Sequence, residues 1–283
     1  MVILDGPNLA WRAAHAARDL ETTDGRPSGV LHAGLMMLSR LPHLLEPDRL
    51  IIAWDGDSLW RKEILPEYKM NRRRTDAERA FAVQVHSQIV FFKEALRAIG
   101  VAQVRHSTLE ADDWAGIIAA RIPQDESLTL LSSDKDWFSL LDGRTRQIRK
   151  WKSDELDVWT ADRLVREYGV GPDRWPEFLA LTGDVSDNIP KVRKGIGPAT
   201  ARKMLEAGFT LVGEEKRTFK RNLKITRLLD KLPDGAQMQS CLTVPDMSRE
   251  KRRLRAFNAL IDVFELSAVR SAQRDLWSLG EWR

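Results

Sequence analysis

Several short apolar runs in the sequence lead into aspartate residues. The runs and the aspartates that follow them are Val2 to Leu4 with Asp5, Leu50 to Trp54 with Asp55, and Leu128 to Leu131 with Asp134 and Asp136. Short, nearly continuous apolar runs are typical of parallel strands that are covered on both faces. Because the carboxyl ends of neighbouring parallel strands meet at one edge of a sheet, we expect these carboxylates to lie close together.

A fourth apolar run, Val101 to His106, precedes an acidic turn that contains Glu110, Asp112 and Asp113. Acidic residues are favoured at helix N-termini, so the helix dipole alone would explain this turn. Together with the other aspartates, however, it would concentrate more negative charge than water and backbone dipoles offset. Oxygen ligands of this kind suit Mg²⁺ or Mn²⁺, and two such ions about 3.5 to 4 Å apart are the usual arrangement for phosphodiester hydrolysis. The sequence therefore predicts a site for two divalent ions.

A second acidic pair, Asp184 and Asp187, precedes a basic, glycine-rich turn. Either aspartate alone would be explained as a cap of local backbone groups. Residues 189–201 predict a glycine turn followed by a helix that begins with proline. Free amides at such a helix start hold phosphate, and nearby cations strengthen the contact without reading base sequence. The residues that we assign to this DNA contact are Lys191, Arg193, Lys194, Gly195, Gly197, Thr200, Arg202 and Lys203.

Positive charge is segregated along the chain although the net charge is small. The 45 Lys and Arg residues stand against 41 Asp and Glu, which leaves a formal charge of +4. Basic residues gather in the runs 69–74, 144–152, 191–194, 216–224 and 249–255. Such segregation is typical of a surface that binds a polyanion. A single run is more often a solvated helix face, and we favour that interpretation for the last two.

The composition excludes several other classes of protein. With 43% hydrophobic and 30% charged residues, the chain is neither disordered nor fibrous. Cys241 has no partner for an intrachain disulfide, and five histidines without a cysteine cluster leave no zinc spacing. The sequence shows neither a secretion signal nor a membrane-length apolar stretch. We expect a soluble monomer without membrane contact, in the cytoplasm of a bacterial or phage-infected host cell.

Strand-like runs alternate with stretches of helical period, which predicts an α/β fold with a mainly parallel central sheet flanked by helices. Helices are expected at Ala82 to Ile99 and from Trp114 to Ala120. Farther along, apolar residues at helical spacing predict C-terminal helices that pack on the core. These residues are Ile225, Leu228, Leu229 and Leu232, then Leu254, Phe257, Ile261 and Phe264.

Six motifs, taken together and in this order, resemble those of the phage and bacterial 5′ nucleases, the flap endonuclease and 5′→3′ exonuclease superfamily. The motifs are Leu4-Asp5-Gly6-Pro7-Asn8-Leu9 with Arg12, Trp54-Asp55, Tyr68-Lys69-Met70-Asn71-Arg72, Glu110-Ala111-Asp112-Asp113, Ser133-Asp134-Lys135-Asp136, and Gly183-Asp184 through Gly197-Pro198. No motif that we can place follows Gly208.

The resemblance implies a PIN-like nuclease core at residues 1–160 with a helical arch around 60–95. It implies a helical part at 161–283, with a helix-three-turn-helix DNA-binding hairpin around 183–208. The acids that would hold two Mg²⁺ or Mn²⁺ ions, directly or through water, are Asp5, Asp55, Glu110, Asp112, Asp113, Asp134, Asp136, Asp184 and Asp187. The catalytic candidates are Lys69, Arg72, Arg12 and Tyr68, with Tyr68 alternatively a packing residue. Further candidates for DNA contact are Arg73, Arg74 and Trp60.

The glycine hairpin departs from the family pattern. Family members often bind K⁺ there through the carbonyls of a segment that reads roughly Ile-Pro-Gly-Val-x-Gly-Ile-Gly. Here Lys191 replaces the first glycine, and Arg193-Lys194 stands where one residue is usual. Whether this hairpin binds K⁺ therefore stays open. A second departure is the end at Arg283 without a polymerase, from which we expect a free-standing, phage-type nuclease.

These patterns predict a structure-selective, divalent-metal-dependent 5′ nuclease of DNA replication or repair that acts on 5′ flaps, nicks, gaps or free 5′ ends. An RNA primer stays open as a substrate, as does a ribonuclease of the same architecture. A haloacid-dehalogenase-type phosphatase, suggested by Asp55-Gly56-Asp57-Ser58, would explain neither the second acidic pair nor the basic hairpin. A non-catalytic DNA-structure binder would be free to lose the acids, which are all present. No Gly-rich nucleotide-binding motif points to a nucleotide cofactor.

Overall fold

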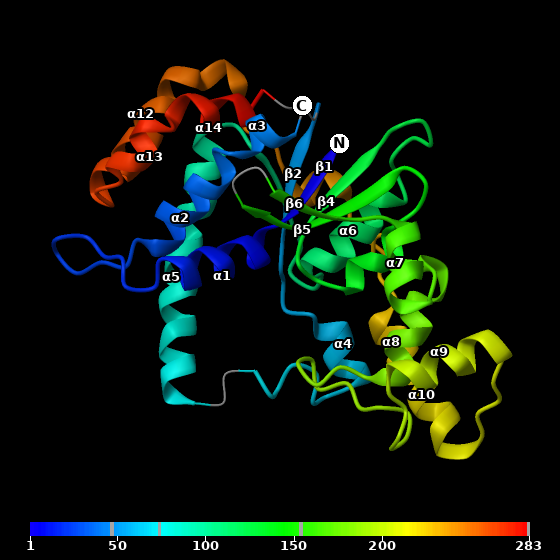
Figure 1. The fold of residues 1–283 in the computed structure, drawn as a ribbon. Coiled ribbons are helices and arrows are strands. Elements are labelled where there is room, and N and C mark those ends of the chain that lie inside the picture. Colours follow the sequence, from blue (N-terminus) through cyan, green and yellow to red (C-terminus); the bar gives the residue numbers. More distant parts are fainter. Residues whose placement is uncertain (46–47, 73–74, 153–154, 282–283) are drawn as a thin grey trace.

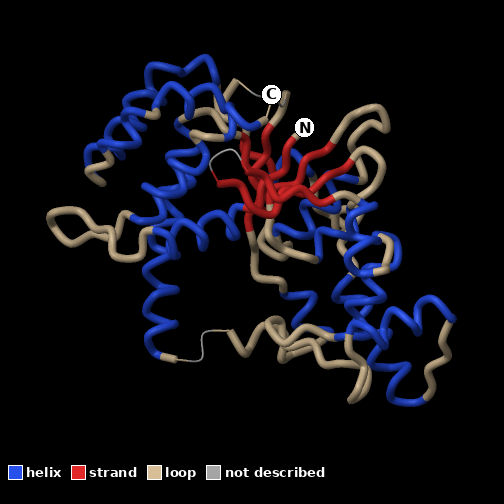
Figure 2. Tube along the Cα trace, in the orientation of Figure 1, coloured by secondary structure: helices blue, strands red, loops and turns tan. Residues whose placement is uncertain are grey.

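The computed structural model describes residues 1–45, 48–72, 75–152 and 155–281. In these residues, seven strands form one sheet in the order β6-β5-β4-β1-β2-β3-β7 (Figures 1 and 2). The strands are β1 (Val2–Asp5), β2 (Leu50–Trp54), β3 (Ala102–Arg105), β4 (Leu128–Leu131), β5 (Thr145–Lys152), β6 (Glu155–Trp159) and β7 (Leu242–Thr243). β5, β4, β1, β2 and β3 pair in parallel, and β6 and β7 pair antiparallel at the two edges. The expected mainly parallel sheet is confirmed.

The register of the central strands brings the predicted carboxylates to one edge. Val2 of β1 lies opposite Leu50 of β2 on one side and Thr129 of β4 on the other. Every residue of β1 and β4 is buried, as expected for strands covered on both faces. Asp5 therefore ends its strand beside the ends of β2 and β4, which lead to Asp55 and Asp134.

Helices cover both faces of the sheet. One face packs on α1 (Gly6–Ala16), α2 (Gly29–Leu38), α5 (Asp76–Ala98) and α12 (Glu250–Val263), and alternate β1 residues Val2 and Leu4 point into that core. Ile3 points to the other face, against α6 (Ala111–Ala119) and the 3₁₀ turn η1 (Asp136–Leu140). The alternation follows from the two-residue period of a strand. The C-terminal helices α13 (Ser267–Ser271) and α14 (Gln273–Leu279) complete the α2 side.

A separate apolar cluster forms the core of a helical module. Its helices are α7 (Ala161–Tyr168), η2 (Pro172–Arg174), α8 (Trp175–Thr182), α9 (Pro198–Ala207) and α10 (Gly213–Thr226). The short helix α4 (Leu59–Ile64) and the N-terminal part of the long helix α5 lie beyond the carboxyl ends of the strands (Figure 1). The remaining helical turns are α3 (Leu41–Leu44), α11 (Met238–Cys241) and η3 (Met247–Arg249).

Two sequence-based expectations need correction. Leu228, Leu229 and Leu232 do not continue a helix, because α10 ends at Thr226. They pack as an irregular segment on the α6 side of the sheet, and a Cβ on Gly116 of α6 would lie 2.4 Å from the Leu229 carbonyl oxygen. The basic run 144–152, for which the sequence predicted no strand, forms β5, and Arg146 and Lys150 of this strand are exposed.

No helix in the described part of the chain combines the length and the hydrophobicity needed to cross a membrane.

α12 does pack on the sheet core as expected, with Phe257 and Ile261 buried, whereas Leu254 is 37% exposed.

Candidate active site

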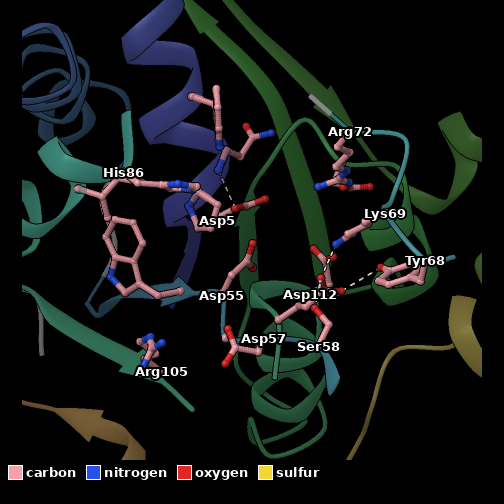
Figure 3. A pocket seen from close by; sticks show the side chains of 18 of the residues that line it. Asp5, Asp55, Asp57, Ser58, Tyr68, Lys69, Arg72, His86, Arg105 and Asp112 are labelled. Atoms are coloured by element: carbon pink, nitrogen blue, oxygen red, sulfur yellow. Dashed lines mark hydrogen bonds and ion pairs between the residues drawn. The ribbon is translucent and has the colours of Figure 1, made fainter. Parts of the chain in front are cut away.

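A cavity of about 940 Å³ opens at the carboxyl edge of the parallel strands. Several of the predicted carboxylates point into it from separate elements (Figure 3). The acidic residues that line the cavity are Asp5, Asp55, Asp57, Glu110, Asp112 and Asp134. We call this set the acidic floor. Asp57 is the one member of this set that the sequence analysis considered only in the phosphatase interpretation.

Asp5 links the end of β1 to the start of α1. Its Oδ1 accepts the Asn8 amide at 2.9 Å as the N-cap of α1, and its Oδ2 accepts the Ser132 hydroxyl at 2.7 Å. Asn8 in turn donates from its side chain to Ser133 at 2.6 Å, which ties the end of β4 to α1. Burial and repulsion by Asp55 raise the pKa of Asp5 to about 7, and the two hydrogen bonds only partly oppose this shift.

The segment that follows β2 is pressed against the loop that follows β3. The Gly56 amide donates to the Leu109 carbonyl at 2.6 Å, and a Cβ on Gly56 would lie 2.2 Å from the His106 carbonyl oxygen. Any larger residue at position 56 would collide with the backbone of the loop that follows β3. This contact fixes Asp55, whose Oδ1 accepts the Ala111 amide at 2.8 Å at the start of α6. Partial desolvation in the cavity and repulsion by Glu110 raise the pKa of Asp55.

The other floor acids are held by neutral donors. Trp137 Nε1 donates to Asp112 Oδ1 at 2.6 Å, and the Asp136 amide donates to Asp134 Oδ1 at 2.9 Å. Burial and repulsion by Asp134 raise the pKa values of Asp112 and Asp136, and burial raises that of Asp134. Such crowding of ionisable carboxylates favours a bound cation.

The donor set of the acidic floor fits a hard divalent cation, since it consists of oxygens only. In the residues that the structure describes, no three His, Cys, Asp or Glu side chains are arranged to hold a single ion as they stand. An ion held by one or two of these carboxylates would complete its shell with water, as Mg²⁺ usually does.

Glu110 differs from the other floor acids because it is paired with cations. Lys69 Nζ contacts Glu110 Oε1, and Arg61 NH1 lies 3.1 Å from Glu110 Oε2. Burial opposes ionisation of Glu110, yet Lys69 and Arg61 hold its pKa at about 2. Tyr68 is buried, and its hydroxyl lies 3.0 Å from Glu110 Oε2 and 3.2 Å from Asp187 Oδ2. The two carboxylates therefore share its single proton. Tyr68 therefore positions two carboxylates.

Lys69 and Arg72 lie at the junction of the α4–α5 segment with the helical module. Arg72 forms an ion pair with Asp187, and the Lys69 amide donates to the Asp187 carbonyl at 2.9 Å. Lys69 has a backbone φ of 60°, a left-handed conformation that is unusual for a long side chain and is most often found at functional sites. A small apolar cluster of Leu65, Tyr68, Ile189 and Ile225 fixes this junction.

The predicted role of Asp113 as a metal ligand needs correction. Its side chain is fully buried and receives two hydrogen bonds of 2.7 Å from Arg61, and it also accepts the Glu110 amide as part of a capping box. Arg61, which is 2% exposed, also donates to the Ile225 carbonyl of α10 at 3.2 Å. Both oxygens of Asp113 are thus engaged by one guanidinium, and we remove Asp113 from the candidate ligands. Sequence reasoning missed Arg61 because its burial depends on distant segments.

Other predicted site residues lie outside the cavity lining. Asp184 accepts the amide and the hydroxyl of Ser186 in a turn closed by a bridge to Ile189. The Arg12 guanidinium lies 4.2 Å from the centroid of the Trp151 ring. The predicted DNA-contact residue Trp60 packs on Arg61, whose guanidinium lies 4.3 Å from the centroid of the Trp60 ring. Asp136 and Asp187 also lie beside the cavity and do not line it. Arg73 and Arg74 fall outside the described residues.

The predicted hairpin presents its cations to solvent. Lys191, Arg193 and Lys194 are exposed, Gly195 has a φ of 90°, and α9 begins at Pro198. The hairpin is held from behind by Asn222 of α10, which donates to the carbonyls of Ala180 and Pro190 at 3.0 and 2.6 Å. Arg193 also lies 3.4 Å from Glu215. Of the remaining assigned residues, Lys203 is exposed, and Thr200 and Arg202 are partly buried.

Comparison with known proteins yields matches to one family. Residues 1–169 match the family described as the 5′-3′ exonuclease, N-terminal resolvase-like domain. DNA polymerase I of Lactococcus lactis subsp. lactis is 32% identical over 215 residues, which cover 73% of this chain and 24% of that protein. The 5′-3′ exonuclease of Aquifex aeolicus is 30% identical over 208 residues, which cover 73% of this chain and 68% of that protein. The chain thus matches about a quarter of the length of the polymerase relatives.

Solved structures agree on the fold. The 5′-exonuclease of T5 with bound zinc superposes with a TM-score of 0.63 at 19% identity and covers 99% of both chains. A complex of the T5 flap endonuclease with DNA and metal ions gives the same TM-score and covers 99% of this chain. The PIN-like 5′ nuclease fold is thereby confirmed, including the part after Gly208 in which we found no motif. With its sheet, its acidic floor and the match over residues 1–169, this chain belongs to the 5′-3′ exonuclease family.

Proposed function

We propose that this protein is a divalent-metal-dependent 5′ nuclease that hydrolyses DNA phosphodiesters at or near 5′ ends, as a 5′→3′ exonuclease and flap endonuclease. The single observation that carries the proposal is the acidic floor at the carboxyl edge of β1, β2 and β4, with Lys69 and Arg72 beside it. The family match favours a nuclease and supports neither the phosphatase nor the non-catalytic binder.

Asp5, Asp55, Glu110, Asp112 and Asp134 are the residues that would hold the divalent ions. The bound ions would supply Lewis-acid activation of water and stabilisation of the leaving oxygen. Mg²⁺ and Mn²⁺ are the ions that the oxygen donors favour. The solved relatives that carry zinc or other metal ions support divalent-metal dependence.

Lys69 and Arg72 now neutralise carboxylates and would exchange them for phosphate oxygens when DNA binds. Both line the cavity, and their ion pairs with Glu110 and Asp187 put their charged groups next to the floor. A cation at a non-bridging oxygen stabilises the charge that develops in the transition state. Tyr68 would keep Glu110 and Asp187 in place during that exchange.

The helical module would hold the duplex part of the substrate. The exposed amides before α9 and the cations Lys191, Arg193 and Lys194 suit sequence-independent phosphate contact. Relatives solved with DNA substrates favour DNA as the partner. K⁺ binding by the hairpin, an RNA primer as the 5′ strand, and a monomeric state remain parts of the proposal to be tested.

The proposal is tested by cleavage of a duplex with a labelled 5′ flap, in Mg²⁺, in Mn²⁺ and in EDTA. A nicked duplex and a flap of RNA are run in parallel. We expect the wild type to release the flap only with a divalent ion, and Asp134→Asn to be inactive. The control Asp173→Asn, which removes the same charge from an exposed site outside the cavity, should cleave like the wild type. Wild-type protein that binds the flap and never cuts it would overturn the proposal.

A further inference from the structure

The cavity has a second cationic side that no motif marks. Lys93 on α5 and Arg105 at the end of β3 both line it. In Figure 3, Arg105 lies on the opposite side of Asp55 and Asp57 from Lys69 and Arg72. Lys93 is half-buried, and its Nζ lies 4.4 Å from the centroid of the Trp54 ring. Cations therefore flank the acidic floor on both sides.

Lys93 and Arg105 lack a directly bound counter-charge in the described part of the chain, and Asp55 attracts Lys93 only at longer range. Among the described carboxylates, none forms an ion pair with either residue, although Asp57 lines the same part of the cavity. Burial and repulsion by Arg105 lower the pKa of Lys93 to about 8. Two cations that face one cavity without an ion-pair partner leave their donors available to an anionic ligand between them.

The position of this pair relative to the helical module indicates which part of a substrate it would meet. Lys69 and Arg72 face the module, because Asp187 contacts both. If the module holds the duplex, a strand that crosses the floor reaches the α5 side beyond the scissile bond. Trp11, Trp54 and Ile89 line the cavity there, and such apolar and aromatic faces suit unstacked bases.

We propose that Lys93 and Arg105 bind backbone phosphates of the single-stranded 5′ segment, on the far side of the scissile bond from the duplex. This inference rests on the proposed function and names a part of its substrate. The ligand class is an unpaired nucleotide strand that is read through its phosphates, without base specificity.

Binding of two DNA substrates tests the inference, in EDTA so that no cleavage occurs. One is a duplex with a 5′ flap and the other a nicked duplex without unpaired nucleotides. Lys93→Gln and Arg105→Gln should each weaken flap binding about three- to tenfold and reduce the slope of log K against log salt by about 0.7. Binding to the nicked duplex should change less than about twofold. The matched control is Arg97→Gln, which removes one charge from the same helix at an exposed residue paired with Glu94.

Neutral methylphosphonate linkages in the flap then locate the contact. In the wild type, one or two adjacent linkages on the 5′ side of the scissile bond should weaken binding when neutral. In the double variant the same linkages should have no further effect, because the partner is already lost. Lys93→Arg and Arg105→Lys, which keep the charge, should restore most of the binding and so exclude a folding defect.

Equal weakening on both substrates, or an effect no larger than that of Arg97→Gln, would overturn the inference. The outcome is separable from the proposed function. A wild type that cuts flaps in Mg²⁺ while the variants bind them normally would refute only the role of Lys93 and Arg105. A wild type that cuts nothing would refute the nuclease itself.

Discussion

The two cationic sides of the cavity differ in how their charges are balanced. On the side of the helical module, Lys69 pairs with Glu110 and Arg72 with Asp187. Arg61, which pairs with Asp113, lies outside the cavity lining, and the lining residue Lys62 of α4 has no ion pair among the described residues. On the α5 side, Lys93 and Arg105 face the cavity without an ion-pair partner among the described residues. The acidic floor between them carries carboxylates whose pKa values are raised by burial and by one another.

This difference indicates which cations must give up a carboxylate when a substrate binds and which can bind a phosphate directly. A phosphate that reaches Lys69 or Arg72 must replace a carboxylate, and that carboxylate then needs a new partner, which a divalent ion would provide. Metal and phosphate binding on the module side are therefore coupled. A phosphate that reaches Lys93 or Arg105 replaces no ion-paired carboxylate, so its binding should depend less on metal than binding at Lys69 or Arg72.

The acidic floor should give the largest change in activity. Asp112→Asn should lower cleavage by more than about a thousandfold in Mg²⁺ while DNA binding in EDTA stays close to that of the wild type. The same variant should be more stable than the wild type without metal, by about 1 kcal/mol, because it relieves repulsion among carboxylates. Single-turnover cleavage and urea unfolding measure the two effects. Lower stability in EDTA would show that the floor is not strained by its own charge.

The buried ion pair beneath the module side should give the largest change in stability. Arg61→Met leaves Asp113 and part of Glu110 buried without a counter-charge, and should cost about 3 to 5 kcal/mol of unfolding free energy. The double variant Arg61→Met with Asp113→Leu should recover a large part of that loss. Urea unfolding of the three variants is the measurement. If the single and double variants are equally unstable, Arg61 acts through its contact with Ile225 instead.

Lys69 should affect the chemical step more than binding. Lys69→Ala should reduce the single-turnover rate about a hundredfold, since it removes a cation that is needed as charge develops on the phosphate. Affinity for flap DNA should fall less than about fivefold, because Lys69 is paired with Glu110 in the free protein and must leave that carboxylate to bind a phosphate. Anisotropy binding and quench-flow cleavage separate the two quantities. Equal losses in both would place Lys69 in ground-state binding and remove the contrast with the α5 side.

Substitution of single hairpin cations should cause the smallest changes, and these should be changes in DNA affinity. Lys191→Ala and Lys194→Ala should each weaken binding to duplex-containing substrates about twofold to fivefold and reduce the salt slope by about 0.9, with cleavage of bound DNA unchanged. Salt titrations of binding are the check. A change restricted to flap substrates would assign these residues to the unpaired strand and contradict the division between the two sides.

The strands that end in acids could be predicted from sequence because their signals are local. Each is a short apolar run followed by a turn, and parallel pairing then brings the acids to one edge without further information. The basic strand β5 was missed because its period is broken: the register between β5 and β6 shifts between Ile148 and Lys150, so polar and apolar positions stop alternating.

The roles of Arg61, Asp113, Lys93 and Arg105 could not be predicted in this way. Asp113 has the same local surroundings as Asp112, yet one is buried against Arg61 and the other lines the cavity. Arg61 is buried only because α4, α6 and α10 meet around it. Such packing depends on contacts between distant segments. The spacing of Leu228, Leu229 and Leu232 likewise fits a helix, although close contact with Gly116 holds them as an irregular segment.

The short strand β7 has a consequence for how the chain is made. β1, β2, β3 and β4 lie within the first half of the sequence, whereas β7 pairs with β3 from Leu242 and Thr243. During synthesis, the outer edge of β3 therefore stays unpaired while nearly half of the chain is made, before its partner emerges. Unpaired sheet edges bind other extended chains. We expect nascent chains stalled before Leu242 to need chaperone protection that the finished protein does not.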